Sequence, residues 1–320
     1  MNDQRSIGLG SSGLGKFSDR RVTADGQPRA SVAFKGLQTL WFNTGTLCNI
    51  ECANCYILSS PRNDALAYLN VLDVEGYLEE LEHLDWGMPE IGFTGGEPFM
   101  NPAMTDILAT TLARGFRVLV LTNAMAPMMR PSVRDGVRQL EQRYPGQMTF
   151  RVSIDHYAVD RHDAERGRGA FEKTIKGMRW LRDNAIRMDV AARTKWGECE
   201  AEVRRGFRAL FEAEGFDIPA DDASRCVLFP EMDESREVPE ITTACWGILS
   251  KRPDDVMCAS SRMIVKRRGA AHPVVLSCTL LAYDRQFEMG RTLEQAAKPV
   301  WLNHPHCAKF CVLGGASCSG

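Results

Sequence analysis

Apolar residues follow two alternating patterns between residue 37 and about residue 230. Short runs that are almost continuously apolar, such as FRVLVLTN and MTFRVSID, predict buried β-strands. Segments such as DVEGYLEELEHL carry apolar residues at helical spacing. Strands and helices take turns along the chain, which indicates a parallel sheet covered by helices.

Six strand–helix units can be read from this pattern. The expected strands cover 37–43, 91–93, 116–123, 148–155, 187–194 and 226–229, and the expected helices cover 73–84, 103–113, 133–144, 170–184 and 199–214. Right-handed crossovers between such units close a partial barrel. We therefore expect an α/β fold, a partial (β/α)6 TIM-like barrel, with its functional groups at the carboxyl ends of the strands.

The chain divides into three expected regions. Residues 1–36 are polar, rich in glycine and serine, and aperiodic, which predicts a flexible or loosely docked N-terminal arm. Residues 37–230 form the barrel. Residues 231–320 contain six of the eleven cysteines and are expected to form a small C-terminal α+β module.

Composition and charge narrow the classes of function. The net charge of −2 gives no general attraction to nucleic acid or to anionic lipid, so neither is an expected partner. No apolar run reaches membrane-spanning length, and the first ten residues lack the apolar core of a signal peptide. The expected location is the cytoplasm, where thiols stay reduced and cysteines serve metal or redox chemistry.

Three cysteines lie close together directly after the first expected strand. Residues 46–55 read TLCNIECANC, which places Cys48, Cys52 and Cys55 at spacings of four and three. A closed structural zinc site takes four ligands, and a disulfide framework takes an even number of cysteines. A zinc site that borrows a distant fourth ligand is the alternative to a metal centre with one open coordination position.

Other distinctive polar residues come at the ends of the following strands. They are Gly95, Gly96 and Glu97 after the second strand, Asn123 after the third, Ser153 and Asp155 at the end of the fourth, and Arg193 at the end of the fifth. Because the strands are expected to be parallel, these residues should share one rim of the barrel with the cysteines.

The segment CNIECANC followed by TGGEP resembles the radical S-adenosylmethionine (SAM) superfamily over residues 37–230. This resemblance implies that Cys48, Cys52 and Cys55 hold a [4Fe-4S] cluster with one iron left free for SAM. It further implies that the reduced cluster splits SAM into methionine and a 5′-deoxyadenosyl radical, which removes a hydrogen atom from a substrate. A flavodoxin- or ferredoxin-type protein is the expected electron donor.

The resemblance also assigns candidate contacts to SAM. It places the methionine amino group at Gly95 and Gly96, and the ribose at Ser153 and Asp155. The family often has an aromatic residue before its last cysteine, but here Asn54 takes that position and Tyr56 follows the cysteine.

Tyr56 is therefore the candidate contact for the adenine. Glu97 either contacts SAM or anchors its turn, and Asn123 either contacts SAM or serves the turn. Ser153 and Asp155 are alternatively a helix cap. Arg193 either binds the SAM carboxylate or forms a surface ion pair.

The C-terminal cysteines suggest a second site. A predicted hairpin between Cys258 and Cys278 is followed by the expected helix RTLEQAAK and by the pair Cys307 and Cys311. This order resembles the Twitch and SPASM modules of the superfamily, which implies that these four cysteines bind an auxiliary [4Fe-4S] cluster. A zinc ribbon or unligated buried cysteines are the alternatives.

Several remaining residues have open roles near this second site. His304 and His306 flank Cys307 and are either additional ligands or solvated. Cys245 is left over. Cys318, in the glycine-rich end of the chain, is a candidate catalytic residue: it either replaces a cluster ligand or donates a hydrogen atom to a product radical.

The expected function is that of a radical SAM oxidoreductase acting on a small molecule, with the auxiliary cluster accepting an electron. A peptide-modifying enzyme or epimerase is one alternative; we favour the small molecule because only about 36 residues precede the first strand, too few for a peptide-recognition domain. A non-catalytic iron–sulfur electron carrier or scaffold is the other alternative.

Overall fold

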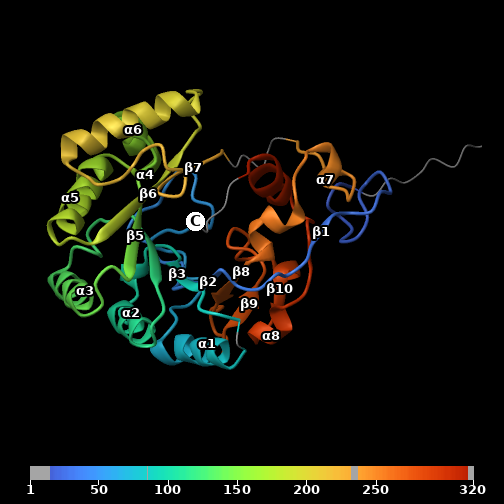
Figure 1. The fold of residues 1–320 in the computed structure, drawn as a ribbon, viewed down its shortest axis with the longest axis horizontal. Coiled ribbons are helices and arrows are strands. Elements are labelled where there is room, and N and C mark those ends of the chain that lie inside the picture. Colours follow the sequence, from blue (N-terminus) through green and yellow to red (C-terminus); the bar gives the residue numbers. More distant parts are fainter. Residues whose placement is uncertain (1–14, 85, 232–236, 316–320) are drawn as a thin grey trace, which may run out of the picture.

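The computed structural model describes residues 15–84, 86–231 and 237–315. At its centre lies a nine-stranded sheet with the order β10-β9-β8-β2-β3-β4-β5-β6-β7 (Figure 1). The barrel part of this sheet has six consecutive strands whose neighbours pair in parallel, and a seventh parallel strand, from the C-terminal region, lies on the other side of the first. The six are β2 (Thr39–Asn43), β3 (Glu90–Thr94), β4 (Val118–Thr122), β5 (Met148–Ser153), β6 (Arg187–Arg193) and β7 (Cys226–Phe229). These are the six strands expected from the apolar runs.

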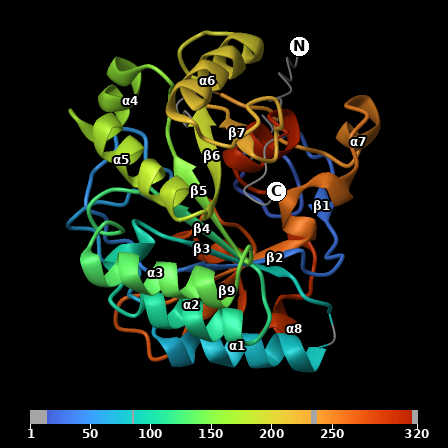
Figure 2. The same ribbon diagram turned by 60° about the vertical axis from the view of Figure 1, so that its left-hand side comes forward.

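Helices alternate with these strands and cover the outside of the sheet, as Figures 1 and 2 show. They are α1 (Val71–Leu84), α2 (Met104–Ala113), α3 (Pro131–Arg143), α4 (Val159–Arg166), α5 (Ala170–Asp183) and α6 (Glu200–Glu214). The α/β fold of a partial TIM-like barrel is confirmed. The short helix α4 was not expected, because its sequence VDRHDAER is mostly charged and lacks apolar periodicity.

The apolar runs are buried because both sides of the sheet are covered. Every residue of β2 is buried, and Phe42 on β2 stacks on Phe93 of β3 with their ring centroids 5.7 Å apart. In the same core, Phe99 stacks on Phe150 of β5 at 5.9 Å. This packing fixes the strand ends that carry the rim residues.

The C-terminal region continues the same sheet. Strand β8 (Ser261–Val265) pairs in parallel with β2, and β9 (Val274–Leu276) and β10 (Glu288–Gly290) follow it in antiparallel pairs. The expected hairpin is therefore present, and its first strand extends the barrel sheet. The short helices α7 (Cys245–Ile248) and α8 (Leu293–Ala296) complete this region.

Residues 15–36 differ from the expected loose arm. Strand β1 (Ser31–Val32) pairs with β11 (Val300–Trp301), and the Ala30 N–H donates to the carbonyl of Ile241 at 2.8 Å. Arg29 is buried and forms an ion pair with Glu240. A buried, paired arginine fixes this segment on the C-terminal region, a partnership that local composition does not reveal. Residues 1–14 of the predicted arm lie outside the described residues.

None of the helices in the described part of the chain is both long enough and apolar enough to cross a membrane.

One glycine of α5 allows that helix to approach the rim. A Cβ atom added at Gly177 would lie 1.9 Å from the carbonyl oxygen of Ala124, next to Asn123. We expect Gly177→Ala to lower the free energy of unfolding by about 1–3 kcal/mol, since the backbone has to move to admit the methyl group. Chemical denaturation monitored by circular dichroism measures the change.

Gly76 on α1 supplies the matched control. Nothing lies within 4 Å of a Cβ built there, so Gly76→Ala is expected to raise the free energy of unfolding by up to about 1 kcal/mol through helix propensity. Equal effects of the two substitutions would contradict the close packing of α5 against the β4 loop.

Candidate active site

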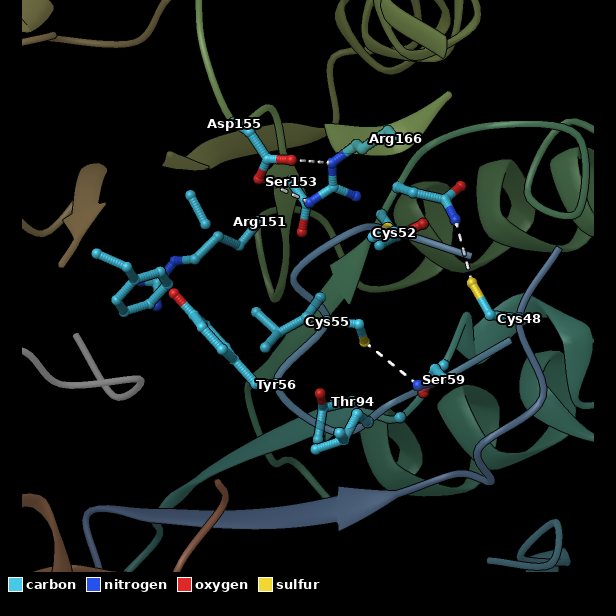
Figure 3. Close-up of a pocket in the computed structure, with 18 of the residues that line it drawn as sticks. Cys48, Cys52, Cys55, Tyr56, Ser59, Thr94, Arg151, Ser153, Asp155 and Arg166 are labelled. Atoms are coloured by element: carbon cyan, nitrogen blue, oxygen red, sulfur yellow. Dashed lines mark hydrogen bonds and ion pairs between the residues drawn. The ribbon is translucent and has the colours of Figure 1, made fainter. Parts of the chain in front are cut away.

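Most of the expected rim residues line one cavity at the carboxyl ends of the parallel strands (Figure 3). The expected residues in its lining are Cys48, Cys52, Cys55, Tyr56, Gly95, Gly96, Asn123, Ser153, Asp155 and Arg193. They come from segments as far apart as β2 and β6, which the parallel sheet brings to one edge.

The cysteine loop is held by its neighbours on both sides. The Cys48 N–H donates to the carbonyl of Ser60 at 3.1 Å, and the Ala53 N–H donates to the carbonyl of Glu165, at the end of α4, at 2.9 Å. Asn54 donates from its Nδ2 to Glu165 Oε2, also at 2.9 Å. Asn54, which replaces the family's frequent aromatic residue, is thus used to anchor the loop.

The three thiols lie within electrostatic reach of one another. Burial, followed by smaller contributions that include Cys52 and Cys55, raises the pKa of the Cys48 thiol to about 12. Burial also raises the pKa of Cys52, against the opposing positive charge of Arg166. Thiolates gathered in such a buried place are stabilised when they bind cationic iron.

The three thiols line one cavity. Cysteine thiolates are the donors that hold iron–sulfur clusters, and each binds a different iron of the cluster. The donor set of Cys48, Cys52 and Cys55 fits three corners of a [4Fe-4S] cluster.

The two glycines of the TGGEP turn pack against the residues before Cys48. A Cβ atom at Gly95 would lie 2.4 Å from the Gly45 carbonyl oxygen, and one at Gly96 would lie 2.3 Å from that of Leu47. Gly95 also has a φ of +138°, which glycine adopts readily. The glycines are thus needed for contact with the cysteine loop as well as for the surface that they give the cavity.

Glu97 lies behind this surface and is 1% exposed. Its carboxylate accepts hydrogen bonds from Thr122 Oγ1 at 2.8 Å, from the Asn123 N–H at 2.8 Å and from the Phe99 N–H at 3.3 Å. Burial raises the pKa of Glu97 to about 7, although these hydrogen bonds oppose the change. The geometry favours the anchoring role of Glu97 over direct contact with SAM.

Asp155 joins two arginines at the rim. Arg166 of α4 donates to both of its oxygens, at 2.7 and 3.0 Å, and Arg193 Nε lies 3.5 Å from Oδ1. Burial alone would raise the pKa of Asp155, but the positive charges of Arg166 and Arg193 hold it below its usual value. With its acceptor atoms engaged by Arg166, Asp155 positions the arginines around the cavity.

Arg193 lies over the ring of Tyr56, with its guanidinium carbon 4.5 Å from the ring centroid. Its Nη2 donates to the Asn54 carbonyl, while Nη1 is buried and has no hydrogen-bond partner among the described residues. A buried donor without a partner costs about 1–3 kcal/mol, which an anionic ligand group would offset. The unpaired Nη1 of Arg193 is therefore placed to bind a carboxylate group of a ligand.

Asn123 and Ser153 also face the cavity. Asn123 Nδ2 donates to Asn49 Oδ1 at 2.9 Å and lies 3.9 Å from Cys48 Sγ, so it contacts the cysteine loop. Its Oδ1 accepts from the Met125 N–H at 3.0 Å, so Asn123 also serves the turn after β4.

Sequence reasoning missed Arg166, Thr94, Arg151 and Phe229, which line the same cavity. Arg166 escaped notice because α4 is a polar helix with no apolar pattern to predict it. In the sequence, Arg166 is only an arginine eleven residues after Asp155. Its contact with Asp155 can be recognised only when α4 is seen to fold back over the end of β5.

The four C-terminal cysteines lie on three short segments of the chain. Cys258 is in the 3-10 turn Met257–Ala259, Cys278 follows β9, and Cys307 and Cys311 belong to the π-helical segment Cys307–Leu313. Burial raises the pKa of Cys307 well above its usual value, and the nearby Cys278 and Cys258 add to the rise. At least three of the four thiols are thus close together.

Cys245, the two histidines and Cys318 were left with open roles near the four C-terminal cysteines. Cys245 Sγ accepts a hydrogen bond from the Thr242 N–H at 3.4 Å and is engaged locally on α7. His306 is buried, and the ring centroids of His304 and His306 are 4.7 Å apart. Cys318 lies outside the described residues.

Comparisons with known proteins identify the family of one region of the chain. Residues 42–192 match the radical SAM superfamily. AlbA of Bacillus subtilis, an antilisterial bacteriocin subtilosin biosynthesis protein, is 32% identical over 146 residues, which are 45% of this chain and 30% of AlbA. An AdoMet-dependent heme synthase of Nitratidesulfovibrio vulgaris is 28% identical over 176 residues, 53% of this chain and 42% of the synthase.

A solved structure shares the fold. The crystal structure of Streptococcus suis SuiB bound to S-adenosylmethionine has a TM-score of 0.58 and 12% identity, and the match covers 80% of this chain and 63% of SuiB. The region of residues 42–192 thus belongs to the radical SAM superfamily, whose enzymes use a [4Fe-4S] cluster and SAM. The matched stretches span less than half the length of these two curated relatives.

The raised pKa of Glu97 predicts a pH dependence of stability. The native state holds a proton that the unfolded state releases near pH 4.5, so the contribution of Glu97 is present below pH 4.5 and is lost as the pH rises through about 7. Glu97→Gln cannot release this proton. We expect wild type to lose up to roughly 3 kcal/mol of stability relative to Glu97→Gln between pH 4.5 and pH 8.

Urea denaturation at a series of pH values measures this difference. Glu212→Gln, an exposed change on α6, is the control and should follow the wild-type profile. Parallel profiles for wild type and Glu97→Gln would show that Glu97 does not hold the proton.

Proposed function

We propose that this protein is a radical SAM enzyme in which Cys48, Cys52 and Cys55 hold the [4Fe-4S] cluster. The observation that carries the proposal is the cavity that these three thiols share with the backbone of Gly95 and Gly96. When bound and reduced, the cluster and SAM supply a 5′-deoxyadenosyl radical that removes a hydrogen atom from the substrate. A flavodoxin- or ferredoxin-type donor supplies the electron.

Different residues of the cavity bind different groups of SAM. Arg193, with its unpartnered Nη1, takes the carboxylate. The cavity-lining backbone of Gly95 and Gly96 takes the amino group, and Ser153 takes the ribose. Tyr56 offers its ring, already stacked on Arg193, to the adenine. Asp155 and Glu97 act as positioning residues, because their carboxylates are engaged by protein donors.

We further propose an auxiliary [4Fe-4S] cluster at Cys258, Cys278, Cys307 and Cys311. Support comes from the mutual electrostatic effect of Cys258, Cys278 and Cys307 and from the burial of Cys258 and Cys307. Four thiolates would saturate the cluster, which suits it to electron transfer instead of SAM binding. Residues 15–36 and 237–315 then belong to one C-terminal cluster region beside the barrel.

Two substrate classes remain as candidates. A small-molecule oxidation is the function expected from the sequence, and the similarity to a heme synthase supports it. Peptide modification is the second candidate: SuiB, which shares the fold, has been solved with its precursor peptide SuiA, and AlbA is a bacteriocin biosynthesis protein.

Replacing all three cysteines of the loop tests the main proposal. The variant Cys48→Ala/Cys52→Ala/Cys55→Ala should lose about four iron atoms per chain and all 5′-deoxyadenosine formation with SAM and dithionite. Cys199→Ala is the control, because Cys199 is exposed at the start of α6, and it should keep both. Continued 5′-deoxyadenosine formation by the triple variant would refute the assignment.

A second set of variants tests the auxiliary cluster. Cys258→Ala combined with Cys307→Ala should remove about four further iron atoms while leaving the SAM-dependent change in the electron paramagnetic resonance spectrum of the first cluster. Cys245→Ala should remove none, because Cys245 is engaged on α7. A wild-type protein with only about four irons and one zinc would support the zinc-ribbon alternative.

A further inference from the structure

A second cavity lies against the cysteine loop, between that loop and residues 280–284. Its volume of about 520 Å³ lies within the range of small-ligand sites. The two cavities share Cys52, Cys55, Tyr56, Ser59 and Leu280 as lining residues. A molecule in the second cavity therefore lies directly beside the group that the cysteine loop holds.

Part of the wall of this cavity is apolar and strained. Leu58 is 70% exposed and has a φ of +50°, a left-handed conformation that is unfavourable for leucine. Leu281 and Ala282 lie among the other lining residues. Such strain persists where the surrounding structure enforces it, and it concentrates at ligand sites. Leu58 is thus held where its side chain offers apolar surface to a ligand.

Three acidic side chains line the cavity, and His306 lines it as well. Glu51, Glu231 and Asp284 line it, and none of its described lining residues is a lysine or arginine. Glu51 lies 3.6 Å from the exposed Arg62, and Asp284 accepts two hydrogen bonds from Gln286. Glu231 differs: its Oε2 is buried and has no hydrogen-bond partner among the described residues.

Ser59 gives a second, independent sign of a ligand. It is 4% exposed, lines both cavities, and its Oγ has no hydrogen-bond partner in the described structure. Its backbone N–H donates to Cys55 Sγ at 3.3 Å, which fixes its position (Figure 3). An unpaired buried hydroxyl costs about 1–3 kcal/mol, and a polar ligand group would offset that cost.

We propose that the second cavity binds the cationic part of the substrate, an ammonium or guanidinium group, at Glu231. The apolar part of the same substrate packs on Leu58, and a polar group hydrogen-bonds Ser59 Oγ. Glu231 is half-buried, and one of its carboxylate oxygens is buried without a partner among the described residues. Such an oxygen favours a cation over a neutral group, because the cation supplies both charge and hydrogen bonds. This proposal rests on the proposed function, which makes the cysteine loop the place of the chemistry.

The ammonium group that Glu231 would bind can come from two kinds of substrate. A free alkyl amine and the lysine side chain of a peptide present the same ammonium group. A peptide also supplies backbone amides for Ser59 and a neighbouring side chain for Leu58. The experiment therefore uses cadaverine for the free amine, and acetyl-Leu-Lys-Leu-amide for the peptide. Acetyl-Leu-Gln-Leu-amide is the neutral match.

Isothermal titration calorimetry on the anaerobically reconstituted full chain measures the dissociation constants. We expect a cationic probe to bind at least ten times more tightly than the neutral peptide. Glu231→Gln should reduce this preference to less than twofold while keeping the iron content of wild type. Glu237→Gln is the matched control: Glu237 is exposed and pairs with Lys16, and its removal should keep the full preference.

The outcomes separate the proposals. Tight binding of cadaverine alone identifies a free amine as the source, and tight binding of the lysine peptide alone identifies a peptide. The absence of any preference for a cation, or an unchanged preference in Glu231→Gln, overturns the cationic-substrate proposal. Formation of 5′-deoxyadenosine by the same preparation is measured in parallel. Absence of 5′-deoxyadenosine would contradict the proposed radical SAM function, whereas the binding measurements alone decide whether the second cavity prefers a cation.

Discussion

The arrangement of the rim depends on one close backbone contact, between the Gly95–Gly96 turn and the residues that precede the cysteines. The Gly96 N–H donates to the Gly45 carbonyl at 2.8 Å, and the Glu97 N–H donates to the Leu47 carbonyl at 3.2 Å. A side chain at either glycine would collide with backbone oxygen atoms. The turn after β3 and the loop after β2 are thus joined as one surface, and a shift of either would move the other.

Buried charge extends this surface to the opposite side of the cavity. Asp155 pairs with Arg166 and Arg193, and Glu165 pairs with Lys195 while it also holds Asn54 of the cysteine loop. Such pairs are costly to bury and costly to break once buried. Their direct result here is positional: α4, β6 and the cysteine loop are fixed against each other although their sequences are far apart.

The strands, five of the helices and the shared rim could be predicted from sequence because each depends on a local pattern. Near-continuous apolar runs marked the strands, and parallel pairing brought their ends together. Arg166 could not be predicted, because α4 has no apolar period and its role depends on folding back over β5. The role of Glu97 was left open, since only its burial and its bond to the Asn123 N–H distinguish an anchor from a ligand contact. The packing of residues 15–36 was missed because a lone arginine, Arg29, does not indicate its distant partner Glu240.

The pairing of β8 with β2 has a consequence for the barrel as a folding unit. Without β8, β2 would be an edge strand, with unpaired N–H and carbonyl groups beside the fully buried Leu40 and Phe42. Exposed edges of this kind template the association of one chain with another. The strand that follows Cys258 therefore also covers the edge that β2 would otherwise expose, so the C-terminal region protects the barrel sheet from pairing with another chain at that edge.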